Sequence, residues 1–156
     1  MPAEPTRPAP LLTEDNAAFW AAAAEGRLVT QRCAECGRFR HPPRPMCPEC
    51  HSLAVDIVDL SGEGTIYSFS ILHYPTTPYF DYPVLGLLVD LDEGIRLVSN
   101  LVDIDPAWIT DLSLIGRRVT VAFVPTAGGM AVPVFRLADA GAGPAAAGAS
   151  DPGAVR

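Results

Sequence analysis

The four cysteines of this chain form two pairs with the same spacing, Cys33-Ala-Glu-Cys36 and Cys47-Pro-Glu-Cys50. Two CxxC turns joined by a short loop can direct four thiolates to the corners of a tetrahedron, which is the geometry that Zn²⁺ prefers. Because four protein ligands leave no open coordination position, the spacing predicts a structural zinc site rather than a catalytic one. The alternative is a pair of redox-active CxxC motifs, but these normally lie where a strand meets a helix in a βαβ unit, and the sequence has no such pattern.

Two histidines and a group of arginines surround the cysteines. His41 and His51 could replace a thiolate, but with four cysteines present we expect them to pack around the turns. Guanidinium groups match phosphate oxygens in a bidentate fashion, so the arginines could hold the phosphates of a coenzyme, although scattered solubilising charge is the alternative. No GxGxxG or GxxxxGK[ST] motif is present, so nucleotide binding of the Rossmann or P-loop type has no support. The first group is Arg38, Arg40 and Arg44, and a second group is Arg96, Arg117 and Arg118.

An aromatic and proline-rich segment occupies residues 73–83. It is too long for a tight hairpin and too aromatic for a solvated linker. Exposed, it would be a surface for a partner or a ligand, because Tyr and Phe contribute strongly to interfaces; buried, it would close one end of a barrel. Its histidine could act as a general base, but no neighbouring Ser or Cys offers a nucleophile, so we expect no catalysis by the chain alone. The candidate surface consists of His73, Tyr74, Tyr79, Phe80 and Tyr82.

Net charge and hydropathy restrict the function further. The 156 residues carry a formal net charge of -7 and contain no lysine. A sequence-independent grip on nucleic acid needs a basic surface that displaces counterions, so the charge argues against that function. No apolar run approaches the roughly 20 residues of a membrane-spanning helix, and the start of the chain lacks the pattern of a signal peptide. We therefore expect a cytoplasmic protein, in which paired cysteines favour metal binding over disulfides.

One helix and a series of short strands would position these residues. Thr13 is a suitable N-cap and Gly26 a suitable C′ residue, so a helix is expected over 13–27, with Phe19 and Trp20 docking on a neighbouring element. A zinc ribbon is expected over 28–53, with its first strand at 28–32 and the return strand at 38–41. Later strands alternate or run apolar between Gly, Pro and Asp signals. They are expected at 55–60, 65–74, 84–92, 95–102, 119–124 and 132–137.

This order predicts a mainly β protein in which a small OB-fold barrel spans 54–138. A β-sandwich is the alternative, but the number of strands is low for it. One helical turn is expected at 106–109. The Pro-rich lead-in (1–12) and the Ala- and Gly-rich tail (139–156) cannot bury enough apolar surface to order themselves, so both are predicted to be disordered.

A helix, a four-cysteine ribbon and a small barrel in this order resemble the DUF35 family of OB-fold proteins with a rubredoxin-like zinc ribbon. The resemblance covers about residues 13–138. The Pro-Pro-Arg before the second cysteine pair and the later glycine turns make it specific. It is carried by Phe19-Trp20, Cys33-Ala-Glu-Cys36-Gly37, Pro42-Pro-Arg-Pro-Met-Cys47-Pro-Glu-Cys50, Gly62-Glu-Gly-Thr-Ile-Tyr-Ser68, Leu91-Asp-Glu-Gly-Ile-Arg-Leu97 and Ile115-Gly-Arg-Arg-Val119.

The resemblance implies a non-catalytic accessory subunit with structural zinc. Members of the family look like partners of thiolase-like proteins, including steroid side-chain aldolases, or of MaoC-like enoyl-CoA hydratases, and their OB domain is thought to shape the path of the acyl-CoA. The family also implies acyl-CoA as a bound ligand. A nucleic-acid-binding zinc ribbon with an OB-fold is the alternative, because OB strands often bind single strands. Family members often begin with a helical hairpin, whereas the proline-rich start of this chain permits one helix.

Overall fold

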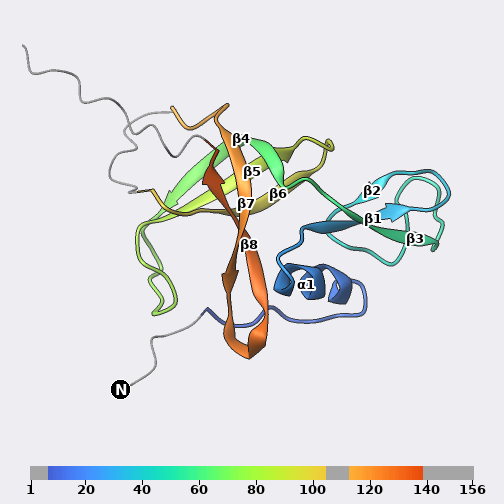
Figure 1. Cartoon of the computed structure of the whole chain (residues 1–156), viewed down its shortest axis with the longest axis horizontal. Coiled ribbons are helices and arrows are strands. Elements are labelled where there is room, and N and C mark those ends of the chain that lie inside the picture. The colour runs from blue at the N-terminus through green and yellow to red at the C-terminus, as the bar shows by residue number, and fades with distance from the viewer. Residues whose placement is uncertain (1–6, 105–112, 139–156) are drawn as a thin grey trace, which may run out of the picture.

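The described part of the chain is mainly β with one α-helix, as the sequence predicts (Figure 1). The computed structural model describes residues 7–104 and 113–138. The expected tail (139–156), the expected helical turn at 106–109 and the first six residues of the expected lead-in lie outside these ranges. Within them, none of the helices has the length and apolar character needed to cross a membrane.

Helix α1 spans Ala17–Ala24 and begins later than residue 13, where the sequence predicts its start. Thr13 still stabilises this end of the helix. Its hydroxyl accepts a hydrogen bond from the Asn16 amide (3.3 Å), and the Asn16 side chain accepts one from the Thr13 amide (2.8 Å), as in a capping box. After the helix, Gly26 adopts a φ of 77°, which is the left-handed conformation expected of a C′ residue.

The ribbon contains a three-stranded antiparallel sheet in the order β2-β1-β3. The sequence predicts that β3 belongs to the barrel, but all five of its residues pair with β1, from Val29↔Asp59 to Cys33↔Val55. The barrel closes without this strand, and a closed barrel has no free edge to which it could pair. The sheet therefore extends beyond the expected boundary at residue 53. Its strands are β1 (Val29–Cys33), β2 (Phe39–Arg40) and β3 (Val55–Asp59).

The barrel consists of five strands in the closed order β4-β5-β6-β8-β7. Antiparallel pairing joins neighbouring strands, and a parallel contact at Leu101↔Phe135 joins β6 to β8. This five-stranded closed barrel is the OB-type architecture that the sequence predicts. The strands are β4 (Glu63–Leu72), β5 (Val84–Leu91), β6 (Arg96–Leu101), β7 (Arg118–Pro125) and β8 (Ala131–Leu137), with a 3-10 turn η2 at Ala127–Gly129 between the last two.

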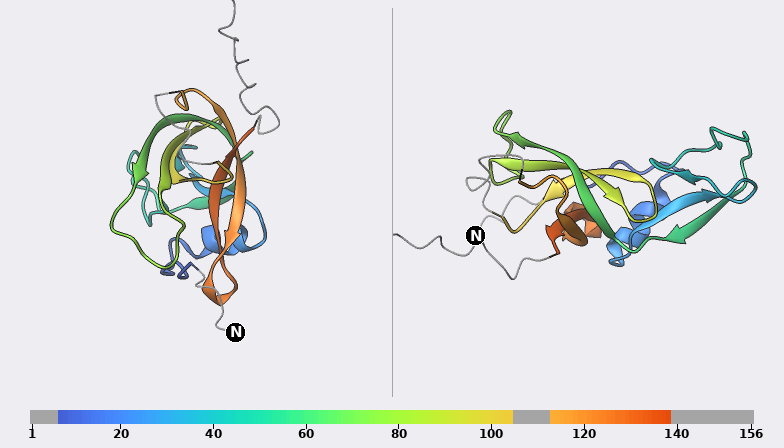
Figure 2. Two further views of the ribbon diagram at one scale, coloured as in Figure 1. Left: turned by 90° about the vertical axis from the view of Figure 1, so that its left-hand side faces the viewer. Right: turned by 90° about the horizontal axis from the view of Figure 1, so that it is seen from above.

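Helix α1 joins the ribbon to the barrel. Phe19 is 8% exposed and belongs to the same apolar cluster as the inward residues of β5 and Leu28, which leads into β1. The sheet projects from one end of the barrel, and α1 lies where the two meet (Figure 2). The helix contacts β1 on one side and β7 and β8 on the other. The expectation that the Phe19 region docks on a neighbouring element of the same chain is therefore confirmed.

Candidate metal centre

The two cysteine pairs lie on turns with the same hydrogen-bond pattern. In the first turn the Gly37 amide donates to the Cys33 carbonyl (2.9 Å), and in the second the His51 amide donates to the Cys47 carbonyl (3.1 Å). Gly37 and His51 have positive φ values of 74° and 58°, which reverse the chain directly after each pair. The repeated CxxC motif therefore produces a repeated backbone shape.

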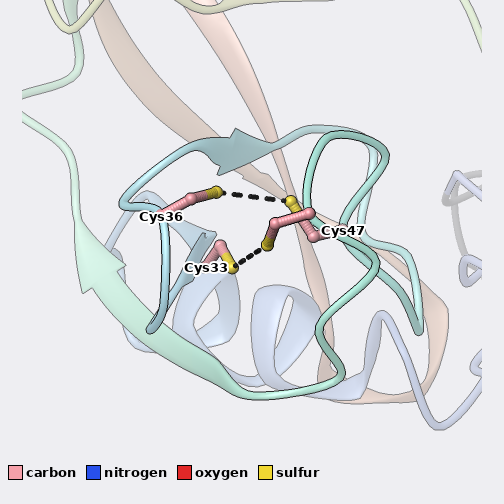
Figure 3. Close-up of side chains that lie close together, drawn as sticks. Cys33, Cys36 and Cys47 are labelled. Atoms are coloured by element: carbon pink, nitrogen blue, oxygen red, sulfur yellow. Dashed lines mark hydrogen bonds between the residues drawn. The ribbon is translucent and has the colours of Figure 1, made fainter.

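The four sulfur atoms converge on one centre (Figure 3). The Sγ atoms of Cys33 and Cys50 are 3.5 Å apart, those of Cys36 and Cys47 are 3.6 Å apart, and all four lie within 4.8 Å of one another. A Zn–S distance of about 2.3 Å places the corners of a tetrahedron about 3.8 Å apart, which matches this spacing. All four cysteines are free of disulfides. The cluster therefore fits a four-coordinate zinc ion.

Hydrogen bonds within the turns favour thiolate at the leading cysteine of each pair. The Cys36 amide is the largest influence that lowers the pKa of the Cys33 thiol, to about 5, and the Cys50 amide lowers the pKa of the Cys47 thiol. For the Cys50 thiol, the Ser52 amide lowers the pKa, but burial and the neighbouring thiols outweigh it and raise the pKa to about 12. A divalent metal ion bound at this site would displace the proton of the Cys50 thiol.

The three arginines near the cysteines lie in different surroundings. Arg40 is 2% exposed and donates hydrogen bonds to backbone carbonyls inside the ribbon. Arg38 is exposed and pairs with Glu49 at 3.0 Å. Arg44 is also exposed, and among the described residues its side chain forms no ion pair. The predicted cluster is therefore not one surface: Arg40 faces inward, whereas Arg38 and Arg44 face solvent. No sequence signal separates Arg40 from its neighbours in advance.

Arginines of the second predicted group are bound to carboxylates on the barrel. Arg96 pairs with Asp90 at 2.6 Å and lies over the Tyr67 ring, with 3.3 Å between the guanidinium carbon and the ring centroid. Arg118 pairs with Asp92 at 2.6 Å. Each guanidinium holds the pKa of its carboxyl partner below the usual range. These two arginines are therefore neutralised within the chain and do not form a basic patch.

The aromatic segment at 73–83 connects β4 to β5 and lies mostly on the surface. Phe80 and Tyr82 are half-buried and contact each other edge to face, with their ring centroids 6.4 Å apart. The Arg7 guanidinium lies 4.6 Å from the centroid of the Phe80 ring. The segment is therefore an exposed loop with an inner edge rather than a plug of the barrel. Its exposed members include His73, Tyr74 and Tyr79.

A cleft of about 490 Å³ lies between α1, the proline-rich part of the ribbon, β6, β8 and the aromatic loop. Phe19, Trp20, His41 and Phe80 contribute to its walls. His41 packs near the Phe19 ring, with centroids 5.8 Å apart, and burial lowers the pKa of its imidazole. His51 is exposed on its turn, so neither histidine joins the sulfur cluster. Sequence reasoning missed the cleft because its walls come from segments that are distant along the chain.

Comparison with known proteins identifies the family. Residues 20–56 match the ChsH2 rubredoxin-like zinc ribbon domain, and residues 57–124 match the ChsH2 C-terminal OB-fold domain. A solved chain titled "Ltp2-ChsH2(DUF35) aldolase" is 43% identical and superposes with a TM-score of 0.75, covering 83% of this chain and 99% of that chain. The chain belongs to the DUF35 family. The resemblance inferred from the cysteine pairs and glycine turns is thereby confirmed.

Two curated relatives of this DUF35 chain differ in extent. A probable enoyl-CoA hydratase alpha subunit from Thermomonospora curvata is 44% identical over 132 residues, which are 85% of this chain and 40% of the relative. A DUF35 domain-containing scaffold protein from Methanothermobacter thermautotrophicus is 36% identical over 98 residues, which are 62% of this chain and 71% of the relative. The chain thus spans less than half the length of the hydratase subunit and most of the scaffold protein.

Proposed function

We propose that this DUF35 protein is a non-catalytic accessory subunit that binds a thiolase-like enzyme, either a ketoacyl-CoA thiolase or an aldolase, and helps to shape its acyl-CoA site. The observation that carries the proposal is the match to the chain of an Ltp2-ChsH2(DUF35) aldolase structure over 99% of that chain. In the hydratase relative the match covers only 40% of the length, so this chain corresponds to part of that subunit.

Zinc bound by Cys33, Cys36, Cys47 and Cys50 has a structural role in this proposal. The donor set is closed, because four thiolates fill a tetrahedral zinc ion and leave no position for substrate or water. The three strands that surround the site bury only one aliphatic side chain, that of Val29, so metal binding would supply folding free energy that the ribbon lacks.

The aromatic loop and the adjoining cleft are the proposed contact region for the partner and its acyl-CoA. Tyr74 and Tyr79 are 83% and 43% exposed, and Phe80 belongs to the cleft wall. The cleft volume lies within the usual range for a ligand site, about 300–1,000 Å³. Arg44 comes directly after Pro42 and Pro43, which belong to the wall of the cleft. Its guanidinium forms no ion pair with any of the described residues, so it is the proposed contact for a coenzyme phosphate.

The test is co-expression with a thiolase-like protein of the same genome, followed by size-exclusion chromatography. We expect one complex that contains both chains, and weaker association for Tyr79→Ser. Ile57→Thr is the matched control, because Ile57 is 46% exposed and lies on the ribbon sheet, away from the loop. If only Ile57→Thr weakens the complex, the contact region is misassigned; if no complex forms, the thiolase-like partner is contradicted.

A MaoC-like enoyl-CoA hydratase is the second candidate partner. It is favoured by the 44% identity to a probable enoyl-CoA hydratase alpha subunit. Parallel co-expression with a hydratase-type protein separates the two candidates, because the partner that co-elutes at equal expression is the one that the surface fits. Binding to the hydratase alone would keep the accessory role and replace the partner.

A further inference from the structure

Arg40 lies inside the ribbon, next to the cysteine cluster. Its side chain is 2% exposed, and its guanidinium donates hydrogen bonds to the carbonyls of Ser52 (3.0 Å) and Ala54 (2.8 Å). Each carbonyl also accepts an amide of one cysteine turn: Ser52 accepts the Cys47 amide (2.9 Å), and Ala54 accepts the Ala34 amide (3.2 Å). The guanidinium therefore links the backbone of the first turn to that of the second.

The two buried cysteines, Cys33 first and then Cys47, raise the pKa of the Arg40 guanidinium, which is consistent with a charge that lies near their sulfurs. Its Nε atom is buried without a hydrogen-bond partner, and no carboxylate pairs with Arg40 in the part of the chain that the structure describes. A zinc ion bound by four thiolates carries excess negative charge, and a buried charge is costly unless an opposite charge compensates it. Arg40 supplies such a charge on the side of the cluster that water does not reach.

We propose that Arg40 is a positioning residue of the zinc site, which holds the two cysteine turns together and offsets the excess negative charge of the four thiolates. The inference rests on the structural zinc of the proposed function. The inference extends that function because it gives Arg40 a role at the zinc site, whereas the sequence analysis groups Arg40 with the candidate coenzyme contacts. The consequence is that Arg40, and not its exposed neighbours, controls how fast the ribbon releases zinc.

The test is the rate at which the zinc-loaded full chain transfers its metal to a coloured chelator in excess. Arg40→Met removes both the charge and the hydrogen bonds, and we expect release faster by roughly 10- to 100-fold, as for other residues that support metal ligands. Arg40→Lys keeps the charge but loses the planar guanidinium, so its rate of zinc release should lie between those of the wild type and Arg40→Met. Arg38→Met is the matched control; its exposed ion pair contributes little, so it should release zinc at nearly the wild-type rate.

A spectroscopic readout separates this role from a general loss of stability. In the cobalt-substituted protein, a positive charge beside the sulfurs stabilises their filled orbitals, so the sulfur-to-cobalt charge-transfer band of Arg40→Met should shift to lower energy. A loosened fold with an unchanged sulfur environment would leave the band in place.

Three results would overturn the proposal: Arg40→Met with wild-type release, Arg38→Met as fast as Arg40→Met, or an unshifted cobalt band. If Arg40→Met cannot be recovered folded, Arg40→Lys decides, because wild-type release by that variant would contradict the role of the planar guanidinium. A wild-type chain that binds no zinc would instead contradict the structural zinc of the proposed function, so the two failures are distinguishable.

Discussion

At the residue scale, the two cysteine turns differ at the position that reverses the chain. Gly37 occupies it in the first turn with a φ of 74°, and His51 occupies it in the second with a φ of 58°. A side chain in this left-handed region costs about 1–2 kcal/mol relative to the ordinary helical region, whereas glycine adopts it freely. The first turn thus avoids a cost that the second turn bears.

We therefore expect opposite effects from two substitutions in these turns. Gly37→Ala should lower the free energy of unfolding of the zinc-loaded protein by about 1 kcal/mol, because the added Cβ approaches Arg32 no closer than 3.4 Å and the cost is mainly in the backbone. His51→Gly should leave stability unchanged or raise it. Denaturant unfolding at fixed zinc concentration measures both. A large loss in His51→Gly would show that the imidazole has a role that the turn geometry does not reveal.

Residue types and spacing predict the sulfur cluster but not its surroundings. The ligand set follows from the sequence because each CxxC turn is local, and the turn geometry aims its two thiolates together. The burial of Arg40 depends on the pairing of β2 with β1 and on the return of the chain to Ala54, which are contacts between distant segments. Arg38 and Arg40 look equivalent in sequence, and only the fold separates them.

At the element scale, strand patterns predict the barrel well, and the misassigned strand is β3. The barrel strands are apolar runs between turn residues, and β5 alternates buried and half-buried residues, so the sequence pattern locates these strands within one or two residues. β3 is an edge strand whose residues are mostly exposed, including Val55 and Ile57 at 41% and 46%. Its partner is set by the cysteine turns rather than by its own pattern, so sequence periodicity could not place it in the correct sheet.

The exposed edge makes the ribbon sheet the element most dependent on metal. Removal of zinc by a chelator should open β1, β2 and β3, because nearly all of their buried side chains are polar or belong to cysteine and cannot hold the sheet alone. Amide hydrogen exchange should then accelerate over Val29–Cys33 and Val55–Asp59, while the amides of Val84–Leu91 in the barrel core stay protected. Re-addition of zinc is the control and should restore protection. Unchanged exchange in the ribbon would contradict a structural role for the metal.

At the scale of the whole molecule, charge distribution bears on the nucleic-acid alternative. OB-fold proteins that bind single strands combine a basic groove with stacked aromatics. Here a groove of about 560 Å³ on the outer face of β4, β5 and β6 is lined by serine, glycine, asparagine and apolar residues, with no charged side chain among its lining residues. At the edge of this face, Arg96 is paired with Asp90. The face therefore suits an uncharged surface better than a phosphate backbone.

We accordingly expect no saturable binding of short single-stranded DNA or RNA to the zinc-loaded chain, even at low salt. The net charge of -7 repels the phosphate backbone, and arginines of the barrel already pair with carboxylates. Fluorescence anisotropy across a salt series measures this, with a single-strand-binding OB-fold protein as the positive control. Binding that weakens linearly with the logarithm of salt concentration would reveal phosphate contacts and favour the nucleic-acid function. In that case Arg44→Ala should reduce the salt slope, since Arg44 is an exposed cation without an ion-pair partner among the described residues.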